Sequence, residues 1–162
     1  MKKLSIITTV FFVFDIVIIN FLPIDFSYQT INYIPSFSLI IFLLNSESIK
    51  INDQILLILI IGLFQDIFAM NFSLINMFTN LFILFLYKFW SKNVSGTTLE
   101  NTTLLLLIIF VKDLMTLLFF NIVNITNLNL TSFIINNALI TFCINIVLLP
   151  LIINFSKNYL YK

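Results

Sequence analysis

Long apolar segments dominate the chain, and short polar stretches separate them. Six such segments can be placed, at residues 4–22, 34–44, 55–70, 74–90, 104–120 and 133–153. A helix needs roughly 20 apolar residues to cross a bilayer, and five of the segments reach or approach that length. The second segment is short unless it begins near Phe26, and Pro35 suits the first turn of a helix there. The pattern predicts an all-α protein with six transmembrane helices.

The composition agrees with this pattern. Of the 162 residues, 60% are hydrophobic and 9% are charged, whereas a soluble domain carries about 25% charged residues. The apolar segments use most of the chain, so we expect one transmembrane domain over residues 1–162. The apolar run behind Lys2 and Lys3 extends to Leu22 without a small-residue cleavage site. This predicts an uncleaved first helix rather than a signal peptide.

The eight basic residues are all lysines, and their distribution predicts the orientation of the helices. With six spans, loops 23–32, 71–73 and 121–131 share one side of the membrane and contain no lysine. If the second segment did not cross, the lysines outside the helices would split two against five. Lysine-rich segments stay in the cytoplasm, so we expect both termini there. The lysines on that side are Lys2, Lys3, Lys50, Lys88, Lys92, Lys157 and Lys162.

Asp66 is an acidic residue inside the third apolar segment. An ionisable residue at membrane depth is costly, so it marks a functional or a packing site. Helical periodicity places Gly62, Asp66 and Ala69 on one face, at offsets of four and three residues. Because small residues let another helix approach closely, we expect Asp66 to meet a neighbouring backbone or side chain. A proton or substrate site fits the same pattern, but a helix–helix contact is the favoured interpretation.

Three aspartates form a faint repeat in alternate segments: Asp15, Asp66 and Asp113. Coincidence in a biased sequence is the simpler explanation of this repeat. Lys112 precedes Asp113, and a charged lysine in lipid costs roughly 2.5–3.5 kcal/mol on insertion scales. It therefore needs a partner, and any of the three aspartates could supply one. The group would then join three helices through a polar core, unless Lys112 instead lines a small water-filled cavity, as in a solute carrier.

Two other segments carry polar stripes at helical spacing. Such stripes usually hydrogen-bond to another helix, and the chain is rich in asparagine, so we favour packing over ligand binding. The stripes are Ser73, Asn76 and Asn80 in the fourth segment, and Asn137, Thr141 and Asn145 in the sixth.

The residues needed for common catalytic sites are missing from the sequence. The chain has no histidine and one cysteine, Cys143, which excludes Ser-His-Asp triads and zinc sites built on His or Cys. Its two glycines, Gly62 and Gly96, cannot form a glycine-rich phosphate loop. A net charge of +1 gives no indication of nucleic-acid binding. We expect no enzymatic activity, no metal and no cofactor.

The run G-L-F-Q-D-I at residues 62–67 resembles the signature of the bacterial rod shape-determining MreD family. In that family a G-L-x-x-D-[LI] run ends one helix, and a short turn leads to the next. The next helix usually ends in a tyrosine and basic residues, as Tyr87 and Lys88 do here. The segment Y-I-P-S-F-S-L at 33–39 is similar to the family's proline-led second helix. The chain departs from the family at 70–74, where M-N-F-S-L replaces a turn that commonly contains glycines.

The resemblance implies a non-enzymatic scaffold of the cell-elongation machinery in the bacterial inner membrane. Members of the family work with MreC, the actin-like MreB and the peptidoglycan synthases that build the lateral wall. In this chain Gly62 and Asp66 would hold the hairpin of the third and fourth helices, and Lys112 and Asp113 would form an internal polar lock. The family is also similar in fold to the substrate-binding subunits of energy-coupling-factor vitamin importers. A solute-binding membrane subunit is therefore the alternative.

Overall fold

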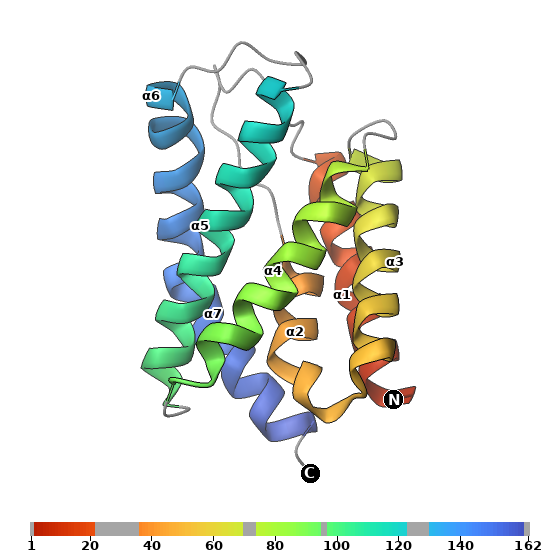
Figure 1. Ribbon diagram of the computed structural model, residues 1–162. Helices are drawn as coiled ribbons and strands as arrows, with labels where there is room; N and C mark the ends of the chain where they lie inside the picture. The colour runs from red at the N-terminus through yellow and green to blue at the C-terminus, as the bar shows by residue number, and fades with distance from the viewer. Residues whose placement is uncertain (1, 22–35, 70–73, 95–96, 123–129, 161–162) are drawn as a thin grey trace.

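The computed structural model describes residues 2–21, 36–69, 74–94, 97–122 and 130–160, and this part of the chain is helical with short turns (Figure 1). It contains no strand, which confirms the prediction of an all-α protein. The elements are α1 (Lys2–Phe21), α2 (Phe37–Asn45), η1 (Ser46–Ser48), α3 (Ile51–Ala69), α4 (Ile75–Ser91), α5 (Thr98–Ile122), α6 (Leu130–Phe133), η2 (Ile134–Ala138) and α7 (Leu139–Leu160).

The long helices run alternately up and down, so α1 begins and α7 ends at the same end of the bundle (Figure 1). Five of the six predicted segments match long helices except for one end residue each at 22, 70 and 74, of which 22 and 70 lie outside the described part of the chain. One of these five, 133–153, belongs to a continuous helix in which α6, η2 and α7 follow one another without a break. One turn of it, η2, is a π-helix. Such turns are frequent at functional sites.

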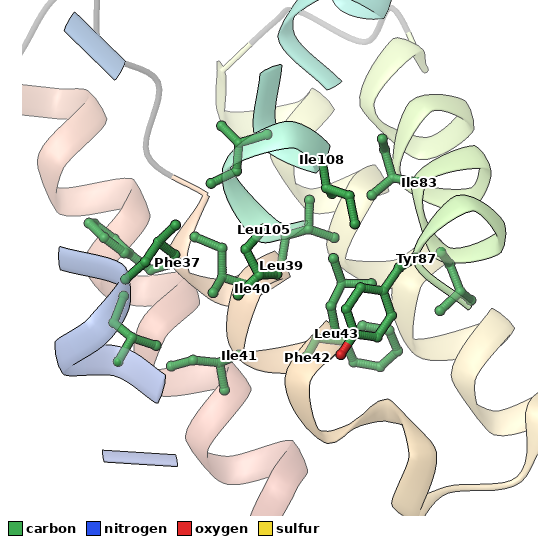
Figure 2. Packing of buried hydrophobic residues seen from close by; sticks show 14 of the residues in the cluster. Phe37, Leu39, Ile40, Ile41, Phe42, Leu43, Ile83, Tyr87, Leu105 and Ile108 are labelled. Atoms are coloured by element: carbon green, nitrogen blue, oxygen red, sulfur yellow. The ribbon is translucent and has the colours of Figure 1, made fainter. Parts of the chain in front are cut away.

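The helix α2 is the centre of the bundle. It packs against α1, α3, α4 and α7, and eight of its nine residues are buried. A helix that is apolar on all sides is expected to be buried on all sides. Figure 2 shows its side chains meeting those of Ile83 and Tyr87 from α4 and Leu105 and Ile108 from α5.

This second helix is shorter than the predicted segment 34–44 at its start. Its nine residues span about 14 Å, less than half of the roughly 30 Å hydrocarbon core of a bilayer. The residues before Ser36, which would complete a crossing, lie outside the described part of the chain.

The distribution of polar and apolar groups is the reverse of that in a soluble protein, in which charged residues are rarely buried. Asp15, Asp66, Lys112 and Asp113 are all buried. The outer surface carries large apolar side chains, and contiguous patches of them mark membrane or protein contacts. One exposed stripe on α4 consists of Phe78, Phe82, Phe85 and Phe89. Two helices, Thr98–Ile122 and Leu130–Ser156, are long and apolar enough to cross a membrane.

Candidate functional site

Asp66 binds the start of the helix that follows its own. The backbone N–H groups of Asn76 and Met77 donate to its two carboxylate oxygens, at 2.9 and 3.0 Å. The first N–H groups of a helix have no partner within the helix and need an external acceptor. The residue before α4, Leu74, supplies no side-chain cap. Asp66 therefore takes the place of the missing cap.

Gly62 lies one turn before Asp66, where α3 and α4 approach most closely. A Cβ at this position would lie 2.5 Å from the Cα of Met77 and 2.9 Å from the carbonyl oxygen of Asn76. The absence of a side chain thus brings the α4 backbone within reach of Asp66. The helix α3 ends at Ala69, whose side chain lies outside what the structure describes.

A second contact on the same helix pair comes from amides. The Nδ2 of Asn80 donates to the Oε1 of Gln65 at 2.7 Å, and both side chains are buried. Asn80 of the predicted polar stripe thus contacts α3, whereas Ser73 of that stripe lies outside the described residues. Gln65 was not singled out by the sequence, although it lies next to Asp66.

Asp15 binds the start of α2 in the same way. Its carboxylate accepts hydrogen bonds from the backbone N–H groups of Phe37 at 3.1 Å and Ser38 at 3.0 Å. The Ser38 hydroxyl donates a third bond, at 2.6 Å. Asp15 on α1 therefore caps the start of α2, as Asp66 on α3 caps the start of α4.

Lys112 reaches this same helix start from α5. Its Nζ donates to the hydroxyl of Ser36, the residue before α2, at 3.0 Å. Lys112 and Asp15 therefore contact the start of α2 from two different helices. The sequence indicated a carboxylate partner, whereas the hydrogen bond goes to Ser36, which no spacing rule singled out.

The turn after α2 is also held by side chains that the sequence did not single out. The amide of Gln54 on α3 donates to the carbonyls of Ser46 in η1 and Ile49 just after it, at 2.5 and 2.6 Å. The hydroxyl of Ser156 on α7 donates to the Oδ1 of Asn45 at 3.2 Å. Polar residues near helix ends are common, so no sequence signal distinguishes these.

Asp113 does not join the other two aspartates. It is buried and faces a groove of about 940 Å³ between α5 and α7, which we call the α5–α7 groove. The residues lining the groove are Thr98, Leu99, Thr102, Thr103, Leu106, Leu107, Ile109, Phe110, Asp113, Ile134, Ala138, Leu139, Thr141, Phe142, Asn145, Ile146 and Pro150.

Several buried polar atoms on the polar stripe of the last long helix have no hydrogen-bond partner in the part of the chain that the structure describes, as is also true of the Oδ1 of Asn80 on α4. They are both amide atoms of Asn137, the hydroxyl of Thr141 and the Oδ1 of Asn145. The Nδ2 of Asn145 donates to the carbonyl of Thr141 at 2.9 Å. Asn137 lies in the π-helical turn, and Thr141 and Asn145 line the groove beside Asp113.

Asp15 and Asp66 thus join helices to one another, whereas the last long helix carries buried polar atoms that no described residue binds. In the described residues, no three His, Cys, Asp or Glu side chains gather in a way that could hold a metal ion. Comparisons of the chain with protein-family models, with curated proteins and with solved structures found no match.

Proposed function

We propose that the chain is a non-enzymatic scaffold of the bacterial cell-elongation complex, with six spans in the inner membrane and both termini in the cytoplasm. The observation that carries this proposal is the contact of Asp66 with the start of α4. The run that resembles the MreD signature is thereby used to join two helices. Its partners would be an MreC-like periplasmic protein, the actin-like MreB and the peptidoglycan synthases.

The apolar exterior supports a membrane location. Exposed phenylalanines along α4 would be costly in water and favourable in lipid. The placement of the lysines supports the orientation, because Lys50 and Lys92 flank helices at the end of the bundle where α1 begins (Figure 1). A lysine-rich end belongs in the cytoplasm.

The use of the buried carboxylates supports binding rather than catalysis. Asp15 accepts three hydrogen bonds and Asp66 two, all from groups at helix starts. A general acid or base must instead be free to exchange its proton with a substrate. These two carboxylates therefore suit the maintenance of a fixed bundle that presents surfaces to other proteins.

The orientation of the helices in the membrane is tested by fusing the chain to reporter proteins that are active on only one side of the membrane. Alkaline phosphatase should be inactive, and a cytoplasmic fluorescent protein bright, when fused after Val94 or after Lys162. Phosphatase inserted within 123–129 should be active. High phosphatase activity after Val94 would contradict the six-span arrangement.

The cellular role is tested by depletion and by co-purification. Depletion of the chain should convert rods to spheres, and the solubilised chain should co-purify with an MreC-like protein. The matched control is a strain depleted and then supplied with the wild-type chain, in which both properties should return. Normal shape after depletion would sink the scaffold proposal.

The α5–α7 groove favours a second candidate, a solute-binding subunit of an energy-coupling-factor importer. Its volume of about 940 Å³ lies within the usual range of ligand sites, about 300–1,000 Å³. A ligand at 100 times its Kd stabilises its protein by about 2.7 kcal/mol. Vitamins and amines screened by thermal unfolding would reveal such a ligand. A scaffold should show no such stabilisation, and its depletion should leave uptake intact.

A further inference from the structure

The π-helical turn η2 contains one residue more than an α-helical turn, and this determines which side chains are buried. The N–H of Leu139 binds the carbonyl of Ile134, five residues earlier instead of four. Phe133 and Asn145, on either side of the turn, are both buried. In a regular α-helix their positions in the sequence would direct them about 120° apart, and the extra residue reduces this angle to about 20°. The π turn therefore keeps Phe133 on the buried face of the helix.

The packing of Phe133 is what the π turn gains. Its side chain is completely buried and packs against Leu117 on α5, together with Leu114 and Ala138. The next residue, Ile134, is 44% exposed. The π turn thus places one of two adjacent apolar residues in this core cluster and leaves the other outside it.

The π turn also has a cost, because two buried polar side chains beside it are unpaired. They are Asn137 within the turn and Thr141 in the first turn of α7, whose donors have no acceptor in the described part of the chain. A buried polar group without a partner is unfavourable. Several other buried Asn and Thr side chains donate to the carbonyl four residues earlier in their own α-helix, namely Asn45, Thr79, Thr102, Thr116 and Asn145.

The acceptors that Asn137 and Thr141 would use in this way are the carbonyls of Phe133 and Asn137. These carbonyls lie directly before the π turn and inside it. Because a π turn is wider than an α turn, a side chain there does not lie over the carbonyl four residues earlier. The unpaired groups are therefore a consequence of the π turn itself.

A regular α-helix over the same residues would reverse both effects. The chain before the turn would rotate by about 100°, so that Ile134 takes the buried place of Phe133. Asn137 and Thr141 would then lie over the carbonyls four residues earlier. One helical face would carry residues at successive offsets of four, three and four, the spacing of a regular α-helix, and these residues are Ile134, Ala138, Thr141 and Asn145.

We infer that η2 is a conformational switch with two forms, a π form that buries Phe133 and an α form that buries Ile134 and pairs Asn137 and Thr141. Since α7 is held by α2 and α5, the part that rotates is the short α6. It lies at the end of the bundle opposite both chain termini (Figure 1). Phe133 turns towards the surface at that end only in the α form. The switch does not depend on the proposed scaffold function.

The two forms are distinguished by distances between pairs of spin labels on the full chain in lipid nanodiscs. The exposed Cys143 is replaced by serine, and cysteines for labelling are introduced at the exposed positions Leu118 on α5 and Leu130 on α6. Side chains lie about 5–6 Å from the axis of their helix, so a rotation of about 100° moves the label at Leu130 by about 8 Å. The control pair, Leu118 and Leu139, lies outside the rotating part and should give one distance in every variant.

Four substitutions shift the balance between the two forms in known directions. Ile134→Phe places a phenylalanine where the α form buries it and leaves Phe133 unchanged. Phe133→Ala removes packing that only the π form has and should shift the equilibrium towards the α form by about 100-fold or more. Asn137→Leu and Thr141→Val remove the groups that only the α form pairs, so these variants should show the distance of the π form alone.

A second distance between Leu118 and Leu130 should therefore grow in Ile134→Phe and in Phe133→Ala. The control for lost packing is Phe120→Ala, at a buried phenylalanine of α5, which should leave the distance unchanged.

A single unchanged distance in both Ile134→Phe and Phe133→Ala would show that the turn has one form, and would overturn the inference. A change in the distance from Leu118 to Leu139 would overturn it as well, because the whole last helix would then move. If Phe133→Ala does not fold, or if Phe120→Ala shifts the distance too, the result for Ile134→Phe decides, since this variant retains every buried phenylalanine.

Discussion

Asp66 illustrates how a single ionisable residue is accommodated in an apolar helix. A buried carboxylate without partners is costly, and so are the free N–H groups at the start of a helix. In this chain the Asp66 carboxylate accepts hydrogen bonds from the N–H groups of Asn76 and Met77. The carboxylate and the helix start therefore satisfy one another. The spacing from Gly62 to Asp66 in the sequence indicated the face and the approach of a neighbour. It did not indicate that the partner is a helix start, since that depends on where the next helix begins.

Substitution of Asp66 should therefore be destabilising in proportion to the acceptors lost. Asp66→Ala leaves two N–H groups unpaired and should lower the free energy of unfolding by about 2–4 kcal/mol. Asp66→Asn retains one acceptor oxygen and should lose about half as much. Thermal unfolding in detergent measures both, with Asn93→Ala at an exposed turn position as the unaffected control. Equal stability of Asp66→Ala and wild type would show that the capping contact contributes nothing.

Leu74 has a backbone conformation that suits glycine. Its φ is 55°, in the left-handed region, which costs a residue with a Cβ about 1–2 kcal/mol. Leu74→Gly removes this cost and should raise the free energy of unfolding by about 0.5–1 kcal/mol, because glycine loses more entropy on folding. Leu74→Val should lower it, since β-branched residues tolerate positive φ worst. Thermal unfolding of the two variants should thus shift in opposite directions, and a fall in both would contradict the argument.

At the scale of elements, the contact of α3 with α4 depends on the missing side chain of Gly62. Within an isolated helix, glycine to alanine gains about 0.8–1 kcal/mol. Here the new Cβ would lie 2.5 Å from the backbone of Met77, and no change of rotamer can relieve that contact. The two helices would have to separate, and the hydrogen bonds of Asp66 would lengthen.

Gly62→Ala should therefore lower the free energy of unfolding by about 1–2 kcal/mol, against the helix propensity of alanine. The control is Leu56→Ala on an exposed position of the same helix, which should change stability by less than about 0.5 kcal/mol. Chemical or thermal unfolding in the same detergent measures both. A stabilised Gly62→Ala variant would show that the helices do not approach as closely as described.

Helix positions were largely predictable, because long apolar runs can form little else in an apolar environment. The short α2 was less predictable, since an apolar run does not show where its hydrogen-bonded turns begin. Its start is bound by Asp15 from α1, and the turn that follows its end is bound by Gln54 from α3. Such contacts between distant segments cannot be read from local patterns. The π-helical turn at Ile134–Ala138 had no sequence signal either.

At the scale of the whole molecule, Lys112 connects segments that are distant in sequence. It is hydrogen-bonded to Ser36, 76 residues earlier, and Ser36 precedes the helix whose start Asp15 binds. The sequence showed that a buried lysine needs acids and named the three available ones. It could not show that two of them are already bound to helix starts while Asp113 faces a groove, because this depends on how the helices pack.

A double-mutant cycle should reveal this coupling. Lys112→Met and Asp15→Asn should each destabilise the chain, but together by less than their sum. The difference should be about 0.5–3 kcal/mol, as for residues in one polar network. The control cycle pairs Lys112→Met with Asp53→Asn, in the first turn of α3, where effects should add within about 0.5 kcal/mol. Additivity with Asp15 as well would show that Lys112 and Asp15 act independently.

The distance of Lys112 from Ser36 along the chain also sets the delay between the synthesis of these two residues. At about 5–20 residues per second, the ribosome adds the intervening 76 residues in about 4–15 s. Until Lys112 is made, the hydroxyl of Ser36 lacks its hydrogen-bond donor on α5. The contact that holds the start of α2 to α5 therefore forms only after α1, α2, α3 and α4 have been synthesised. A product that stops before α5 lacks this contact.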